Sequence, residues 1–490
     1  MGWNSWNRFG CDINEEKIRG VADALVESGM RDAGYEYLNL DDCWQTDRTP
    51  AGEIVVDPVR FPSGMKALGD YVHARGLKFG TYTCAGTMTC QQRPGSAGHD
   101  ARDALSYASW GVDFVKEDWC FTDGMDPRER YAAMRDAIAA SGRDMVLSLC
   151  NWGREQPWIW GREMGSLWRT SGDISDSFLM MMVNMEQTWP LAPYAGPGGW
   201  NDPDMLEVGN GGMTADEYRA HFSLWAMMAA PLIAGNDVRS MTQETRDILM
   251  NAEVIAVDQD PAGVAGTKVR IDTVELWARP LTEAGARAVL LFNRDSEPRP
   301  GGFAWDEVGL APGDATLRDL WRRTDLGTRS GRFDTTVPPH GVVMVVVRGA
   351  EHRPPAGEAR LADLPWKHAA ASPGPVERVT SVTVGGQPLG SGLGVGAASV
   401  VMFDLGGRCT RFRARAGVDD ATGGKGTVAF EVRAGGERGF ASGVIRGGDA
   451  AVPVEVALDG ARELVLVTGP GGDDERGDRA VWADARVECM

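Results

Sequence analysis

The sequence predicts an α/β protein in which a (β/α)8 barrel is followed by two antiparallel β domains. Short apolar stretches alternate with amphipathic helical ones up to about residue 263, a pattern typical of strand and helix units around a parallel sheet. From about residue 264 the apolar residues recur with a period of two, which indicates antiparallel strands. The 490 residues also exceed what one hydrophobic core usually covers, so several domains are expected.

Eight candidate strands lie in residues 1–263, and this length is usual for a (β/α)8 barrel. They are residues 1–3, 35–40, 77–82, 113–117, 145–149, 166–169, 199–202 and 231–234. Between the first two strands, Asn14 is a suitable helix cap, and Ile18, Val21 and Leu25 fall on one helix face. An open doubly wound sheet is the alternative, because periodicity rarely fixes topology.

The remainder of the chain is predicted to be β-rich. Residues 264–349 contain alternating stretches at 273–277, 288–293 and 342–347, separated by turns rich in glycine and proline, which predicts an antiparallel β-sandwich domain. Residues 350–360, with Pro354 and Pro355, have the composition of a linker. Residues 361–490 consist of short strands and glycine-rich turns, which predicts a β-sandwich or jelly roll.

Charge and composition exclude several classes of function. A net charge of −19 repels nucleic acid and anionic lipid, and no apolar run approaches the roughly 18 residues that span a membrane. The eight cysteines lack C-x-x-C spacing and the six histidines are scattered, so neither a metal site nor a cofactor is predicted. The chain opens with MGWNSW, which is not a secretory leader, so either a leader has been removed or the protein stays inside the cell.

Charged residues, mostly carboxylates, follow the predicted strands at their carboxyl ends, where barrel enzymes place their reactive groups. They are Asp41 and Asp42 after the second strand, Lys116 and Asp118 at the fourth, Arg169 and Asp173 at the sixth, and Asp202 and Asp204 at the seventh. Because side chains alternate along a strand, Lys116 and Asp118 should face one side and Glu117 the other. We therefore expect Asp118 to have a cationic neighbour.

Two carboxyl groups in different surroundings suit glycoside hydrolysis. A carboxylate beside an ammonium stays ionised and can act as a nucleophile, whereas a carboxyl in a drier setting holds its proton and can act as an acid. In retaining glycosidases the two groups lie about 5 Å apart, and in inverting enzymes they lie farther apart. The sequence does not supply this distance. For Arg169 and Asp173, a purely structural ion pair is the alternative.

Tryptophans are concentrated near these carboxylates, with eleven of the seventeen in the first 200 residues. Those beside charged residues are Trp6, Trp44, Trp119, Trp152, Trp168 and Trp200. Flat apolar rings next to hydrogen-bonding groups suit a sugar, which has C–H patches and hydroxyls. The alternative is that these rings only fill the top of the barrel.

A series of motifs resembles glycoside hydrolase family 27. The motifs, in order, are MGWNSWNRFGC, YLNLDDCW, DPVRFPSGM, GLKFGTYT, CQQRPGS, WGVDFVKEDWC, WRTSGDI, YAGPGGWNDPDML and PLIAGND. They cover essentially residues 1–263. The resemblance implies a retaining (β/α)8 barrel with a C-terminal antiparallel β domain, and mostly α-galactosidase or α-N-acetylgalactosaminidase activity.

The resemblance also implies roles for individual residues. Asp118 in K-x-D-x-C corresponds to the nucleophile and Asp173 in W-R-T-x-G-D-I to the acid/base. The residues expected around the sugar are Trp6, Asp41, Asp42, Tyr82, Lys116, Asn151, Trp152, Arg169 and Asp204. The paired aspartates should accept from the O4 and O6 hydroxyls, which favours galactose because a missing hydroxyl would leave a buried carboxylate unpaired.

Family pairings imply disulfides Cys11–Cys43 and Cys90–Cys120, which would brace loops at the barrel mouth. Cys150 lacks the partner that it has in some relatives, because Gly165 stands about where that cysteine would be. Members of the family are often secreted, and disulfides fit an extracellular location, although this chain shows no leader.

Two positions depart from the family pattern. Asn151 replaces a glutamate that in relatives helps to recognise the O2 hydroxyl, so an amide that both donates and accepts stands there. Glu117 replaces the usual aromatic residue beside the nucleophile. Strand alternation predicts that Glu117 points away from the sugar, and its sequence context explains no function.

The third domain resembles the NPCBM modules, also called carbohydrate-binding module family 51. The motifs are LADLPW, GLGVGAASVVMFDLGGRCTRF, AGVDD and AVWADARV. The resemblance implies a disulfide between Cys409 and Cys489. Gly396 stands where many such modules have histidine, and Val481 stands where a polar residue is expected, so sugar binding and a purely structural sandwich both remain open.

The sequence therefore predicts a retaining hydrolase that removes terminal α-D-galactosyl units from an oligosaccharide or small galactoside. β-L-Arabinopyranosidase, α-N-acetylgalactosaminidase and isomaltodextranase activities are alternatives with the same catalytic pair. A galactose-binding protein without catalysis is the alternative from another class, and the presence of both catalytic aspartates disfavours it.

Overall fold

The structure, a computed structural model, describes residues 1–472 and 477–490. The chain divides into two compact units. The first comprises residues 1–188 and 196–259, and the second comprises residues 189–195 and 260–490. Among residues 1–472 and 477–490, none of the helices has the length and hydrophobicity of a transmembrane segment.

Eight parallel strands form the barrel of the first unit. In the order in which they pair, they are β10 (Ile233–Ala234), β1 (Gly2–Asn4), β2 (Tyr37–Asn39), β5 (Lys78–Cys84), β6 (Phe114–Asp118), β7 (Val146–Cys150), β8 (Leu167–Arg169) and β9 (Trp200–Asp202). A parallel bridge from Leu206, just after β9, to Ala234 on β10 closes the ring. All eight predicted strands are confirmed to within two residues, and this closed, sequential order excludes the doubly wound alternative.

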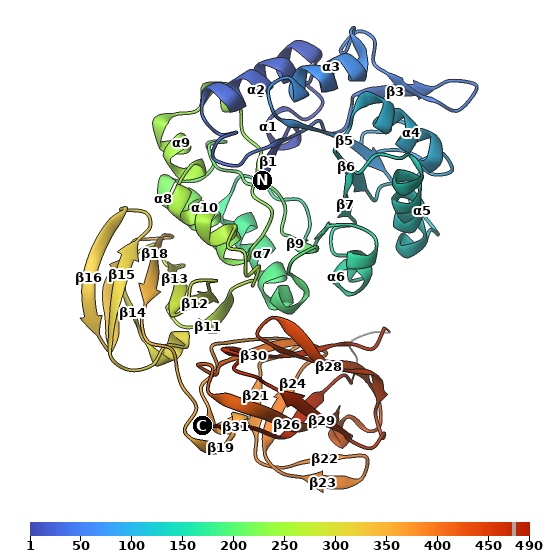
Figure 1. The fold of residues 1–490 in the computed structure, drawn as a ribbon. Coiled ribbons are helices and arrows are strands. Elements are labelled where there is room, and N and C mark those ends of the chain that lie inside the picture. Colours follow the sequence, from blue (N-terminus) through green and yellow to red (C-terminus); the bar gives the residue numbers. More distant parts are fainter. Residues whose placement is uncertain (473–476) are drawn as a thin grey trace. The chain divides into compact units, whose positions relative to one another are not determined.

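Helices follow the strands and lie around the outside of the barrel (Figure 1). They are α1 (Trp6–Phe9), α2 (Glu15–Glu27), α3 (Gly64–His73), α4 (Asp100–Trp110), α5 (Pro127–Ala140), α6 (Pro157–Trp160), α7 (Phe178–Thr188), α8 (Ala215–Met227), α9 (Gln243–Leu249) and α10 (Ala252–Asp258). As predicted, the Asn14 side chain caps α2 and the residues Ile18, Val21 and Leu25 are buried. A short hairpin, β3 (Gln45–Arg48) and β4 (Ile54–Val56), extends from the loop after β2.

The second unit begins with the antiparallel strands that the period of two predicts. The main sheet has the order β11 (Thr267–Arg270), β12 (Val274–Pro280), β13 (Ala286–Asn293), β18 (Val342–Arg348), β15 (Asp314–Asp319) and β16 (Thr324–Ser330). The pair β14 (Arg299–Ala304) and β17 (Arg332–Val337) contributes Phe303 and Phe333 to the same core. On the other face of β12, Trp277 packs edge-on against Trp189, at 6.3 Å between ring centroids, and Trp189 begins the segment 189–195 that belongs to the second unit.

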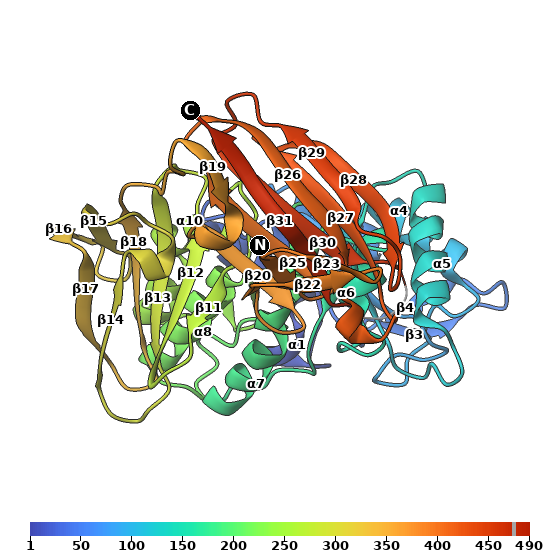
Figure 2. The ribbon, with the colours of Figure 1, turned by 90° about the horizontal axis from the view of Figure 1, so that it is seen from below.

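The C-terminal strands form two facing sheets. One sheet has the order β21 (Glu377–Val379), β24 (Gly392–Val395), β31 (Ala480–Cys489), β26 (Cys409–Val418) and β29 (Val452–Ala457), with β19 (Gly357–Arg360) beside β31. The other has the order β20 (His368–Ser372), β25 (Ala398–Asp404), β30 (Glu463–Pro470), β27 (Thr427–Ala434) and β28 (Glu437–Arg446), and a hairpin joins β22 (Val382–Val384) to β23 (Gln387–Leu389). Figure 2 shows β31, β26 and β29 lying side by side.

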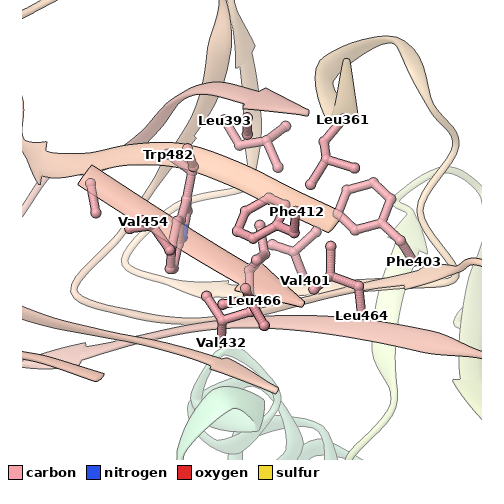
Figure 3. Packing of buried hydrophobic residues seen from close by; sticks show 14 of the residues in the cluster. Leu361, Leu393, Val401, Phe403, Phe412, Val432, Val454, Leu464, Leu466 and Trp482 are labelled. Atoms are coloured by element: carbon pink, nitrogen blue, oxygen red, sulfur yellow. The ribbon is translucent and has the colours of Figure 1, made fainter. Parts of the chain in front are cut away.

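The core between these sheets is apolar and closely packed. Phe412 and Trp482 from the first sheet point toward Leu466 from the second (Figure 3). The Trp482 ring meets Phe430 edge-on at 4.9 Å, which is a favourable arrangement for two aromatic rings. This double-layered β fold agrees with the predicted sandwich.

Candidate active site

The polar residues predicted from the strand ends converge at the carboxyl ends of the barrel strands. A cavity of about 20 Å³ inside the barrel is lined by side chains from most of its strands, including Lys116, Arg169, Asp202 and Asp204. The parallel ladders bring these residues together, because each strand ends at the same edge of the closed sheet.

Asp118 ends β6 and is buried, with 6% of its surface exposed. Its carboxylate accepts hydrogen bonds from the Tyr82 hydroxyl, at 2.9 Å, and from the Trp119 backbone N–H, also at 2.9 Å. Burial raises the pKa of Asp118 to about 6, although the ammonium of Lys116 and the Trp119 N–H act to lower it. The carboxylate is therefore largely ionised at neutral pH.

The direct partner of Lys116 is Asp41. The Lys116 ammonium donates to Asp41 Oδ2 at 2.9 Å, and the same oxygen accepts from Asn4 Nδ2 at 2.8 Å. Burial alone would lower the pKa of Lys116, but Asp41 and other nearby anions hold it well above its usual value. The expected cation beside Asp118 is thus present, but it is bonded to a different carboxylate. Asn4 was not predicted, and its position at the end of a barrel strand is the signal that could have identified it.

Arg169 bridges two aspartates from different strand ends. One of its guanidinium nitrogens lies 3.0 Å from Asp173 Oδ1 and 3.0 Å from Asp204 Oδ2. Burial would lower the pKa of Arg169, but Asp204 and other neighbours hold it well above its usual value. Arg169 and Asp173 therefore form an ion pair. Because Arg169 also contacts Asp204, this ion pair is part of the polar cluster at the barrel mouth.

The surroundings of the two proposed catalytic aspartates are the reverse of those expected. The Asp173 side chain is 66% exposed, whereas Asp118 lies in the drier setting. Asp173 still interacts electrostatically with Asp118, because its charge is one of those that raise the pKa of Asp118. The expectation of a drier acid was wrong because burial depends on packing by segments remote in the sequence.

Backbone N–H groups hold the carboxylates of Asp42 and Asp204 in place. Asp42 accepts from the backbone N–H groups of Cys43, at 2.6 Å, and Gln91, at 3.1 Å, and burial raises its pKa. Asp204 accepts from the backbone N–H groups of Ile174 and Met205, each at 2.8 Å, and burial likewise raises its pKa. These contacts hold both carboxylates in defined positions.

The tryptophans divide between core packing and the barrel mouth. Trp44 and Trp168 are fully buried, and Trp119 stacks on Tyr131 at 5.4 Å between ring centroids, so filling the barrel accounts for these three. Trp6 and Trp152 are partly exposed, as rings that contact a ligand must be.

Asn151 and Glu117 are both buried and both have oxygen atoms without a partner among the described residues. Asn151 Nδ2 donates to the backbone oxygen of Arg154, so its Oδ1 is the atom left available. Glu117 faces charged residues of α4 and α5, and burial raises its pKa well above the usual range. It points away from Asp118, as strand alternation predicts.

Loops at the barrel mouth contain several non-glycine residues with left-handed backbone conformations. They are Cys43, Gln92, Phe121, Trp152, Glu155, Gln156 and Asp204, with φ between 51° and 88°. Such conformations cost free energy and tend to be retained at functional sites. Their concentration after the barrel strands supports a site at this end.

The three expected disulfides are present. They link Cys11 to Cys43, Cys90 to Cys120, and Cys409 to Cys489. Cys84 and Cys150 are free and buried. The Cys90–Cys120 disulfide connects the loop after β5 with the loop after β6, next to Asp118.

Comparison with known families divides the chain into three matched segments. Residues 1–260 match the family described as Alpha galactosidase A. Residues 272–347 match the Alpha galactosidase C-terminal beta sandwich domain, and residues 357–488 match the NPCBM/NEW2 domain.

Similar proteins agree with this assignment. A probable alpha-galactosidase of Dictyostelium discoideum is 48% identical over 353 residues, which are 71% of this chain and 91% of that protein. The crystal structure of alpha-galactosidase I from Mortierella vinacea is 37% identical with a TM-score of 0.70, and the match covers 72% of this chain and 97% of the other. A β-L-arabinopyranosidase from Geobacillus stearothermophilus is 26% identical with a TM-score of 0.65, covering 72% and 97%. The barrel, the arrangement of carboxylates at its mouth and these similarities show that the chain belongs to the alpha-galactosidase A family of glycoside hydrolases.

Proposed function

We propose that this enzyme removes terminal α-D-galactosyl residues with retention of configuration, using Asp118 as the nucleophile and Asp173 as the acid/base. The observation that carries the proposal is the pairing of a buried, hydrogen-bonded carboxylate, Asp118, with an exposed carboxyl, Asp173, which Arg169 holds and whose charge acts on Asp118. Membership of the family, with its α-galactosidase relatives, supports the choice of reaction.

The proposed first step forms a covalent glycosyl-enzyme. Asp118 attacks the anomeric carbon while Asp173 gives its proton to the leaving glycosidic oxygen. Asp118 can act as a nucleophile at neutral pH because its pKa is about 6, and the Tyr82 hydroxyl fixes the orientation of its carboxylate. In the second step Asp173 takes a proton from water, which then attacks the anomeric carbon and releases the sugar.

The charges of Asp118 and Asp173 both change during this catalytic cycle. Asp118 and Asp173 repel each other while both are ionised, and this repulsion is one of the causes of the raised pKa of Asp118. Once Asp118 is esterified it is neutral, so this repulsion ends and Asp173 can act as a base.

The polar residues near Asp118 favour galactose as the bound sugar. Asp41 and Asp42 are buried adjacent carboxylates, and galactose offers a hydroxyl to each, through its axial O4 and primary O6. Arabinopyranose lacks the hydroxymethyl group and would form one hydrogen bond fewer to this pair of carboxylates, a loss of about 1.5–3 kcal/mol. Similarity to a β-L-arabinopyranosidase keeps that activity as the second candidate.

Kinetic comparison of Asp118→Asn, Asp173→Asn and the unaltered enzyme on nitrophenyl α-galactoside tests the assignment. Asp118→Asn should abolish turnover while the circular dichroism spectrum is unchanged. Asp173→Asn should slow glycosides with poor leaving groups more than nitrophenyl substrates, because an activated leaving group needs less proton donation. Substantial activity in Asp118→Asn would refute the assignment.

Two further measurements separate the alternatives. Rates on nitrophenyl α-galactoside and β-L-arabinopyranoside distinguish the two candidate sugars, and rates on the α-N-acetylgalactosaminide test the third. NMR of the first-formed sugar should show the α-anomer, as retention requires. Galactose binding without any hydrolysis would instead support a binding protein.

We also propose that the chain consists of a catalytic barrel (1–263), an antiparallel β domain (264–349), a linker (350–360) and a C-terminal β-sandwich (361–490). The matched segments support this division because they end near the same positions, with the C-terminal match and strand β19 (Gly357–Arg360) both beginning within the proposed linker.

A further inference from the structure

The sulfur atoms of Cys90 and Cys120 lie beside the carboxylate of Asp118. One ligand atom from each of the three residues falls within 4.8 Å of the other two. The Tyr82 hydroxyl links the group, since it donates to Asp118 at 2.9 Å and lies 3.5 Å from Cys90 Sγ. The Cys90–Cys120 disulfide is therefore part of the immediate surroundings of the proposed nucleophile.

Both cysteines are held in place by contacts other than the disulfide. The buried Cys84 thiol forms two hydrogen bonds with the backbone of Cys120. Its sulfur accepts from the Cys120 N–H at 3.1 Å, and its S–H donates to the Cys120 backbone oxygen at 3.2 Å. Beside Cys90, the backbone N–H of Gln91 donates to Asp42 Oδ2 at 3.1 Å. Opening the disulfide would thus leave two thiols close to Asp118. Both cysteines are only half-buried, so a small reductant can reach them.

Two thiolates and a carboxylate form a ligand set that suits zinc. Zinc binds cysteine sulfur at about 2.3 Å and carboxylate oxygen at about 2.0–2.2 Å, and sites with three protein ligands take water as the fourth. Ligand atoms on one such ion are about 3–4 Å apart, a separation that the released sulfurs reach by moving away from each other. Surrounding charge favours a cation, because Asp41 offsets Lys116 through their ion pair and Asp42 lies nearby.

We propose that reduction of the Cys90–Cys120 disulfide creates a zinc site formed by Cys90, Cys120 and Asp118, and that zinc bound there stops catalysis. A dithiol breaks the S–S bond, is itself oxidised to a cyclic disulfide, and leaves two thiols on the chain. Zinc then displaces one proton from each thiol, so two protons are released. Asp118 shares its lone pair with the metal and no longer attacks the sugar. Only this inhibition rests on the proposed function, whereas metal binding does not.

Cobalt titration of the whole chain tests the site without using activity. The chain is reduced with a dithiol under nitrogen, desalted, and titrated with Co²⁺, whose bonds to thiolates give a charge-transfer absorption band. We expect a band that saturates at one ion per chain in the reduced protein and no band in the oxidised protein. The band should be lost in Cys90→Ser/Cys120→Ser. It should remain in Cys11→Ser/Cys43→Ser, the matched control that lacks the other barrel disulfide.

Zinc inhibition of the same samples tests the consequence. At free zinc about ten times the dissociation constant, the reduced enzyme should lose about tenfold in activity, and a chelator should restore it. Zinc should not change the rate of the oxidised enzyme or of Cys90→Ser/Cys120→Ser. A reduced chain without the band, a band that survives in Cys90→Ser/Cys120→Ser, or equal inhibition of the oxidised enzyme would overturn the proposal. Inactivity of the oxidised, metal-free enzyme on galactosides would instead overturn the proposed function and leave the metal site intact.

Discussion

Asp118 experiences two opposing influences on its charge. Burial raises its pKa to about 6, while the Lys116 ammonium and the Trp119 N–H act to lower it. The hydroxyl of Tyr82 also donates to the carboxylate, which favours the ionised form. These contacts place its titration close to neutral pH, and the consequences are measurable.

The first prediction concerns the pH dependence of catalysis. Protonation of Asp118 removes the nucleophile, so kcat/KM should fall about tenfold for each pH unit below about 6. Tyr82→Phe removes a hydrogen bond to the ionised carboxylate, so it should shift this acid limb to higher pH and lower kcat/KM about tenfold or more. An acid limb at the same pH in both enzymes would contradict this account.

The second prediction concerns stability. The ordinary pKa of an aspartate is 3.8, and the folded chain raises that of Asp118 to about 6, so ionisation costs the fold about 3 kcal/mol above pH 6. This cost is absent below pH 3.8, where both states are protonated, grows as the pH rises from 3.8 to about 6, and is constant above that. Asp118→Asn should therefore increase the free energy of unfolding in urea by up to about 3 kcal/mol at neutral pH, and far less near pH 4.

Asp173→Asn serves as the matched control for that measurement. Its side chain is 66% exposed, and changes at such positions usually alter stability by about 0.5 kcal/mol or less. An Asp118→Asn variant that is less stable than the unaltered enzyme at neutral pH would show that its hydrogen bonds outweigh its burial.

Among the elements, the loops after β5 and β6 approach each other closely at Gly86. A Cβ at this position would lie 2.0 Å from the backbone oxygen of Cys120 and 2.5 Å from that of Phe121. Backbone atoms cannot rotate away as a side chain does, so only glycine fits here. The packing of Gly86 thus sets the position of the loop that follows Asp118.

The third prediction follows from this contact. Gly86→Ala should separate the two loops, lower stability by about 1–3 kcal/mol, and reduce kcat because Asp118 shifts. Gly20→Ala on α2 is the control, because its new Cβ meets nothing closer than 3.5 Å and alanine favours a helix by about 1 kcal/mol. Thermal unfolding and steady-state kinetics of both variants test this prediction. Full activity in Gly86→Ala would show that the close approach of the two loops does not position Asp118.

At the scale of the whole molecule, a buried ion pair joins the two halves of the second unit. Arg287 on β13 lies 3.1 Å from Asp404 on β25, and both side chains are almost fully buried. Burial lowers the pKa of Arg287 and raises that of Asp404 to about 6, so both charges are strongly desolvated. Lys367, at 3.7 Å, is a second cation beside Asp404.

The fourth prediction concerns this ion pair. Asp404→Ala leaves the Arg287 charge buried without its carboxylate and should cost about 3–5 kcal/mol. The double variant Arg287→Met/Asp404→Leu removes both charges and should cost less than the single variant. Calorimetric unfolding of the three proteins provides the measurement, and equal losses in both variants would show that the ion pair does not govern this packing.

The sequence determined which elements form and which way their side chains point. Periodicity located all eight barrel strands, and alternation separated Lys116 and Asp118 from Glu117, because both depend only on residues near in the chain. Motif resemblance added the three disulfides. Tertiary structure alone decided that Asp118 is the drier carboxyl, that Lys116 bonds Asp41, and that two sulfur atoms lie against Asp118. Burial and distance arise from segments that are 30 or more residues apart, and their packing around one closed sheet is not encoded in any local pattern.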